Sequence, residues 1–129
     1  MLITNFSYCE MMREEMGKNV IVNPFTMLVP YSVPTNFSFF ITIGVHDIPQ
    51  SGAKFQFEFI SPSGEKILAQ EFSIPQVVNL SDQDKAGVQL NMGLQNVILK
   101  ETGVYKTTLS HEGILLGEYP IEVIPSVKH

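Results

Sequence analysis

The stretch Asn36-Phe-Ser-Phe-Phe-Ile-Thr-Ile-Gly-Val-His46 decides the fold, because its side chains alternate between apolar and polar. Alternation with a period of two places successive side chains on opposite faces of a β-strand. The apolar face carries Phe37, Phe39, Ile41, Ile43 and Val45. Phe40 interrupts the polar face, where we expect it to contact a partner or a loop. The stretch therefore predicts a long strand with one face in a core.

Similar stretches occur on both sides of this strand, separated by turn residues roughly every 8–12 positions. The expected strands are residues 6–13, 18–22, 36–46, 55–59, 65–74, 88–94, 104–111 and 115–123. Three pairs of them form hairpins, with turns at Glu15-Met-Gly17, Ser61-Pro-Ser-Gly64 and Glu112-Gly113. One short helix is expected, over residues 81–86, with Ser81 as its cap.

Seven to nine short strands in 129 residues predict an all-β fold in which two apolar sheet faces cover each other. We interpret residues 1–129 as a single antiparallel immunoglobulin-like β-sandwich, with a small β-barrel as the alternative. The segment Glu101-Thr-Gly-Val-Tyr105 resembles the start of the penultimate strand of immunoglobulin-like domains, where a Tyr ring packs over the sheet corner.

Composition excludes several function classes. The chain is 44% hydrophobic and 16% charged, with a net charge of −5, and its 8 basic residues are scattered. Nucleic acids and anionic membranes need clustered Lys and Arg, so we expect neither as a partner. A single cysteine, Cys9, excludes an intrachain disulfide and fits a reducing compartment. Without a signal-like start or a long apolar run, the expected location is cytoplasmic.

Two polar groups are weak candidates for chemistry. His46 and Asp47 close a strand, where they could bind a metal or form a general base, or else simply be a solvated strand end. Glu10 and Arg13 belong to an acidic stretch that could supply paired carboxylates, or could form a charged hairpin face that keeps an outer strand from pairing. The three histidines lie far apart in sequence. We therefore predict no catalytic site, no metal site and no cofactor.

The segment Asn23–Thr35 is the strongest functional hint. Its three prolines argue against continuous ladder pairing, yet it is too apolar for a solvated loop. Either it covers one end of the core, or it forms an exposed surface for a partner protein or a second copy. The residues of this candidate interaction surface are Phe25, Met27, Leu28 and Tyr31, together with Phe40.

The opening stretch Phe6–Val22 resembles a family of small uncharacterised bacterial proteins with an immunoglobulin-like β-sandwich. Glu10, Arg13 and Gly17-Lys18 match its most recognisable positions. Glu10-Met11 stands where the family has an acidic pair, which argues against a two-carboxylate site. The resemblance implies the fold and no assigned activity.

These observations predict a non-enzymatic, cytoplasmic protein-interaction module that self-associates. A sandwich that binds a small ligand or carbohydrate is the alternative, although the chain has no Trp and only 4 Tyr for an aromatic platform. A hydrolase built around His46-Asp47 or the acidic stretch is the third possibility.

Overall fold

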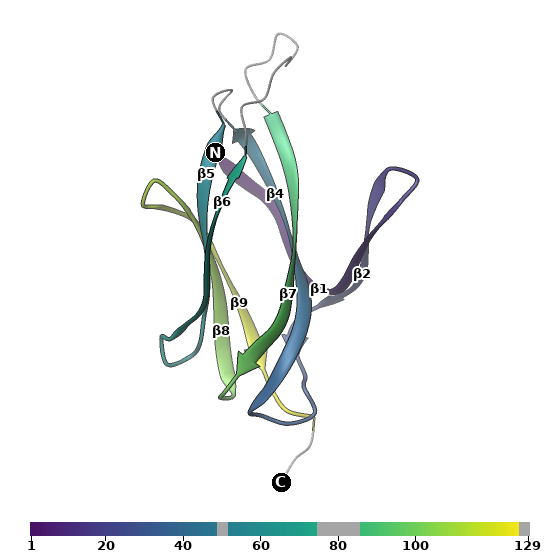
Figure 1. The fold of residues 1–129 in the computed structure, drawn as a ribbon, viewed down its shortest axis with the longest axis vertical. Coiled ribbons are helices and arrows are strands. Elements are labelled where there is room, and N and C mark those ends of the chain that lie inside the picture. The colour runs from purple at the N-terminus through teal and green to yellow at the C-terminus, as the bar shows by residue number, and fades with distance from the viewer. Residues whose placement is uncertain (49–51, 75–85, 127–129) are drawn as a thin grey trace.

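The computed structural model describes residues 1–48, 52–74 and 86–126, and within these ranges it contains nine β-strands and no helix (Figure 1). The strands are β1 (Leu2–Glu15), β2 (Lys18–Phe25), β3 (Met27–Leu28), β4 (Thr35–Ile48), β5 (Ala53–Ile60), β6 (Lys66–Ile74), β7 (Ala86–Leu99), β8 (Gly103–His111) and β9 (Ile114–Val123).

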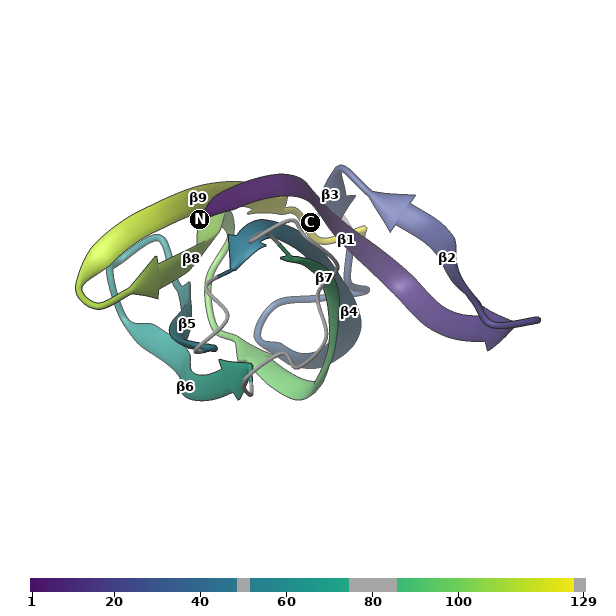
Figure 2. The ribbon, with the colours of Figure 1, turned by 90° about the horizontal axis from the view of Figure 1, so that it is seen from above.

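The strands form two sheets that pack face to face. One sheet has the order β2-β1-β4-β7 and the other has the order β3-β9-β8-β5-β6. Every neighbouring pair is antiparallel except β3 and β9, which run parallel. Among the described residues no strand of one sheet pairs with a strand of the other. Figure 2 shows the two sheets from above. The prediction of a sandwich is therefore confirmed over the alternative of a closed barrel.

The connectivity is that of an immunoglobulin-like domain. β4 and β7 lie side by side in one sheet, while β5, β8 and β9 are neighbours in the other, as in the alternating order of that fold. The predicted corner is also present. The Tyr105 hydroxyl at the start of β8 donates a 2.7 Å hydrogen bond to the Glu101 carbonyl oxygen. This bond fixes the turn before β8, because the ring is itself fully buried.

The core lies between β4 and β5, where the predicted alternation holds. Phe39, Ile41 and Ile43 on β4 are no more than 1% exposed. They face Phe55, Phe57 and Phe59 of β5, which are equally buried. Burying one such side chain stabilises the fold by about 1.5–3 kcal/mol. The rings of Phe39 and Phe59 lie 5.6 Å apart between centroids, which links the two sheets directly.

A bulge in β7 keeps its apolar side chains in this core. Phe39 pairs with Leu94 and Phe37 with Val97, so β7 has one extra residue at this point. Asn96 takes a positive φ of 55° there, and its backbone N–H donates a 3.0 Å hydrogen bond to the Ser38 hydroxyl. As a result both Leu94 and Val97 point inward and are buried.

The bounds of the first two strands differ from the prediction. β1 begins four residues earlier than expected and ends two residues later. The prediction that the prolines prevent continuous ladder pairing over Asn23–Thr35 is confirmed, because Thr26 and residues 29–34 lie outside the strands, although β2 continues to Phe25. Pro24 pairs with Cys9 on an edge strand, where a missing N–H is tolerated. Most of the expected helix over residues 81–86 lies outside the described residues.

The first hairpin extends away from the sandwich. β1 pairs with β4 only as far as Cys9, whereas its pairing with β2 continues to Glu15. Residues 10–23 therefore form a ribbon of two strands that projects to one side (Figures 1 and 2). We call this ribbon the β1–β2 arm. Its outer strand, β2, ends the sheet.

Candidate functional site

The structure places His46 and Asp47 at the end of β4. His46 Nδ1 lies 3.0 Å from Asp47 Oδ1, and both side chains are partly exposed. His46 borders a shallow hollow, shared with Gly44, Gly87 and Gln89. The pair is thus a local contact at a strand end, beside a hollow that is open to solvent.

Glu10 and Arg13 lie on the arm and not beside His46. Glu10 accepts a 3.0 Å hydrogen bond from the Asn23 side-chain amide across the ribbon. Arg13 pairs with Glu15 at 2.9 Å, and both side chains are more than half exposed. His46 pairs with Leu2, eight residues along β1 from Glu10. At about 3.3 Å per residue, roughly 26 Å separates the two candidate groups, so they do not form one site.

Other reactive groups do not converge either. In residues 1–48, 52–74 and 86–126, no three His, Cys, Asp or Glu side chains come close enough together to hold a metal ion. Cys9 is fully buried, and burial raises the pKa of its thiol. The same ranges contain no helix with the length and apolar character needed to cross a lipid bilayer.

The structure divides the candidate surface of the Asn23–Thr35 segment between core and solvent. Leu28 is fully buried, so it covers the core and is not available to a partner, which corrects its assignment to an exposed surface. Its strand β3 pairs with β9, which draws this side chain under the sheet edge. Phe25 packs partly against the core. Met27 and Tyr31 remain on the surface, 43% and 77% exposed.

Phe40 is half-buried for a reason internal to the fold. It pairs with Cys9 on one side and with Gly93 on the other. A side-chain carbon built on Gly93 would lie 3.0 Å from Phe40 Cε1, so the ring covers the bare backbone of that glycine. An aromatic ring across from a glycine in a sheet compensates for the missing side chain. The interruption of the polar face is explained by this cross-strand pair.

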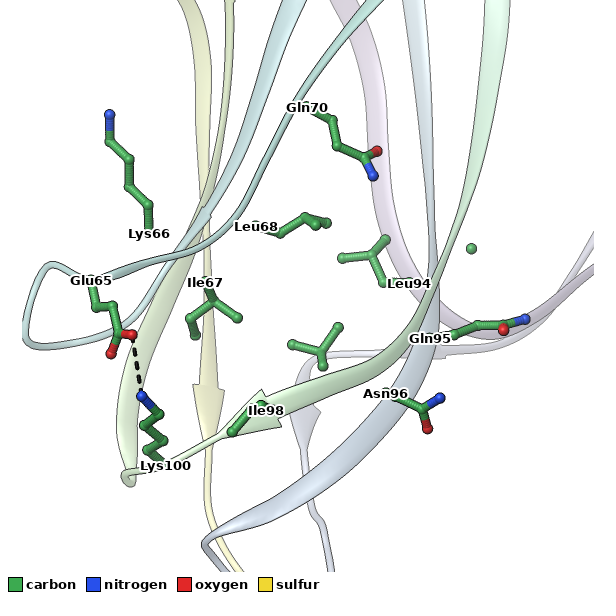
Figure 3. A pocket seen from close by; sticks show the side chains of 12 residues that line it. Glu65, Lys66, Ile67, Leu68, Gln70, Leu94, Gln95, Asn96, Ile98 and Lys100 are labelled. Carbon is green, nitrogen blue, oxygen red and sulfur yellow. Dashed lines mark hydrogen bonds and ion pairs between the residues drawn. The ribbon is translucent and has the colours of Figure 1, made fainter.

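A cleft not anticipated from the sequence opens between β6 and β7, the edge strands of the two sheets (Figure 3). Its volume is about 310 Å³, within the usual range for small-molecule sites. Ile67 and Leu68 of β6 form one wall, and Leu94 of β7 lies opposite. The cleft therefore has apolar side chains on both walls and is bordered by two strands that do not pair with each other.

Polar side chains surround this apolar interior. Lys100 Nζ lies 3.3 Å from Glu65 Oε1 across one end of the cleft, and both side chains are more than half exposed. Lys66 also borders it and pairs with Glu58 at 3.3 Å. Of the described residues that line the cleft, none is aromatic. The cleft thus lacks the ring platform on which sugars usually stack.

The arm carries the other notable surface. Met16 at its tip is fully exposed, and Met11 and Ile21 are 47% and 44% exposed. Sequence reasoning identified the hairpin but missed its projection, because alternation within two strands does not show where their neighbours end. Similarly, Ile67 and Leu68 of the cleft read as ordinary strand residues. Of these two surfaces, only the arm could have been noticed in the sequence, because residues 19–23 between Lys18 and Pro24 form an uncharged run.

Comparisons with known proteins give a family and no activity. An immunoglobulin-like protein from Pseudomonas aeruginosa is 13% identical, with a TM-score of 0.45 and 95% coverage of both chains. An alkylpurine DNA glycosylase from Pseudomonas fluorescens, bound to DNA containing an abasic site analogue, is 10% identical. Its TM-score is 0.39, and the match covers 77% of this chain and 29% of that one. These likenesses assign no function.

No curated protein sequence matches the chain. The pattern of a family of unknown function, DUF6941, matches residues 5–124. The resemblance seen in the opening hairpin, to a family without an assigned activity, is confirmed by this match. Because it spans most of the 129 residues, the chain belongs to DUF6941, a family of unknown function.

Proposed function

We propose that this chain is a non-enzymatic protein-interaction module that self-associates through the β1–β2 arm. The observation that carries the proposal is the projection of the arm, as a two-stranded ribbon with exposed Met11, Met16 and Ile21. A ribbon of only two strands is marginally stable in water, and a sheet of three or more gains stability. Covering the apolar side chains of the arm would also remove them from water.

A second copy of the chain is the partner that the charges favour. Two molecules with a net charge of −5 repel each other over most of their surfaces. The outer strand of the arm differs, because residues 19–23 carry no charge. Arg13 and Glu15 on the inner strand neutralise each other as an ion pair. Two arms can therefore approach edge to edge without bringing like charges together.

Sedimentation velocity over a range of protein concentrations tests this proposal. We expect the wild-type chain to form dimers, and the Ile21→Lys variant to stay monomeric because a charged side chain on the arm would lose its water at the contact. Ile114→Lys is the matched control, since Ile114 is 66% exposed on the β8–β9 hairpin, away from the arm. A wild-type protein that stays monomeric throughout would contradict the proposal, as would equal dissociation of both variants.

A second candidate function is the binding of a small apolar molecule with an acidic group, and the cleft between β6 and β7 favours it. Its apolar walls suit the hydrocarbon part, and an acid would replace Glu58 or Glu65 as the partner of Lys66 or Lys100 at its border. Anilinonaphthalene sulfonate is a probe with this chemistry. Binding should weaken in Ile98→Glu, which changes a residue lining the cleft, and persist in Val104→Glu. Both side chains are about half exposed, at 50% and 53%. Equal binding by the two variants would exclude the cleft.

A further inference from the structure

We infer that two copies pair through the outer edges of β2, antiparallel and centred on Ile21, to give a continuous sheet across both arms. This inference rests on the proposed self-association and adds the strand, the register and the symmetry of the contact.

The edge of β2 is available for such pairing. β2 lies at the end of its sheet, so its only strand neighbour in the described part of the chain is β1. One side of β2 is hydrogen-bonded to β1, and the other side presents backbone N–H and C=O groups outward. A second β2 strand would satisfy these groups in the same way that β1 satisfies the inner ones.

The sequence of this edge is symmetric. Residues 19–23 read Asn-Val-Ile-Val-Asn, which is the same in both directions about Ile21. A two-fold contact centred on one residue places the residue before it opposite the residue after it in the other copy, so a segment that reads the same in both directions matches residues of the same kind. Centred on Ile21, Val20 of one copy meets Val22 of the other, and Ile21 meets Ile21. Paired β-branched side chains of this kind stabilise antiparallel sheets by about 0.2–1 kcal/mol each.

Other registers lose this match. A shift by one residue in either direction places an Asn of one copy opposite a Val of the other. A shift by two residues places an Asn opposite Ile21. The centred register alone pairs apolar residues with apolar ones and Asn with Asn throughout this segment.

The inner strand of the arm extends the match. Met12 pairs with Ile21 within one copy. In the centred register a single row across the four strands would therefore read Met12, Ile21, Ile21 and Met12. Side chains directly opposite in an antiparallel sheet lie on the same face. The row would cover the partly exposed Ile21 side chains with each other.

Lys18 and Pro24 limit the contact to this segment. In the centred register they lie opposite each other, so the two Lys18 side chains do not meet. Pro24 has no N–H to donate, and pairing ends there. The outer edge of β2 therefore pairs with a partner strand only over the short segment of residues 19–23.

Cysteine cross-linking tests the register. In Ile21→Cys, two directly opposite residues have Cα atoms about 4.5–5.5 Å apart, within the span of a disulfide. In Val20→Cys alone, or in Val22→Cys alone, each cysteine lies two residues along the strand from the position opposite the other cysteine. The distance between their Cα atoms then exceeds the span of a disulfide. Copper–phenanthroline in air supplies the oxidant, removing two electrons and two protons from each thiol pair.

We expect Ile21→Cys to form a covalent dimer, and Val20→Cys and Val22→Cys to form one only when mixed together. The wild-type chain, in which Cys9 is fully buried, should form none. Noncovalent dimers of Ile21→Cys that do not cross-link would overturn the register and leave self-association standing. Cross-linking of Val20→Cys alone to the same extent would also overturn it. A protein that is monomeric by sedimentation would instead refute the self-association itself.

Discussion

The phenol oxygen of Tyr8 on β1 lies 2.8 Å from the hydroxyl oxygen of Thr107 on β8, and this contact joins the two sheets through the core. The same phenol lies 2.6 Å from the carbonyl oxygen of Tyr119. A carbonyl oxygen can only accept, so the Tyr8 hydroxyl donates to it, and the Thr107 hydroxyl is then the donor to Tyr8. Each sheet thus supplies part of one buried hydrogen-bonded group.

Tyr8→Phe is expected to destabilise the fold by about 1–3 kcal/mol near neutral pH, because it leaves buried polar groups of Thr107 and Tyr119 without their partner. Burial raises the pKa of Tyr8, an effect that the hydrogen bond to Thr107 partly offsets. Below an unfolded pKa of about 10 the contribution of Tyr8 to stability is fully present, and it declines as pH rises toward the higher folded pKa.

The stability difference between wild type and Tyr8→Phe should therefore narrow above about pH 10. Urea unfolding of both proteins, near neutral pH and at about pH 10.5, measures this difference. A difference that stays constant or widens over that interval would show that Tyr8 ionises as readily in the folded state as in the unfolded one.

Tyr105→Phe removes the hydrogen bond to the Glu101 carbonyl oxygen while keeping the buried ring. We expect a loss of about 1–2 kcal/mol in the free energy of unfolding. Tyr31→Phe makes the same chemical change on a side chain that is 77% exposed, and should alter stability by less than about 0.5 kcal/mol. Thermal unfolding of the two variants measures both losses of stability. Equal losses would show that the hydrogen bond of Tyr105 does not stabilise the corner.

Phe40→Ala is expected to lower stability by about 1–3 kcal/mol, because it uncovers the Gly93 backbone and part of β1. Phe40 borders a surface hollow together with Met12, Arg13 and Glu14, but its strand partner is Cys9 and not a residue of the arm. Self-association through the outer edge of the arm should therefore not change. Chemical denaturation and sedimentation velocity separate the two readouts. If the Phe40→Ala dimer dissociates while its free energy of unfolding is unchanged, Phe40 is part of the interaction surface.

The positive φ of Asn96 leads to opposite expectations for two substitutions. Asn96→Gly should be neutral within about 1 kcal/mol, because glycine adopts this conformation freely. Asn96→Val should cost about 1–3 kcal/mol, since a β-branched residue is strained there. Equilibrium unfolding distinguishes them, and a stable valine variant would mean that the bulge can move along β7.

The sequence predicted the elements that alternate clearly, and β4 is the best example. Phe39, Ile41 and Ile43 are all buried as expected, because the period of two is a property of the strand itself. The Tyr105 corner was also predictable, since it depends on contacts four residues apart.

Features that depend on distant pairing could not be predicted in the same way. Phe40 looked like an exposed ring because Gly93, which it covers, is far away in sequence. Leu28 looked available to a partner because its pairing with β9 lies nearly a hundred residues further on. The expected strand ended at Val22, before Pro24, yet β2 continues through Pro24 because an edge position tolerates the missing N–H. The cleft likewise forms where β6 and β7 come close without pairing.

The passage from β2 to β3 gives the arm a mechanical property. β2 ends at Phe25 in one sheet, and β3 begins at Met27 in the other, so only Thr26 separates the two layers. The other strand of the arm, β1, is hydrogen-bonded to β4 as far as Cys9. A force that pulls on the tip of the arm is therefore divided between the two sheets. It must break the β1–β4 and β3–β9 ladders together before the arm can detach.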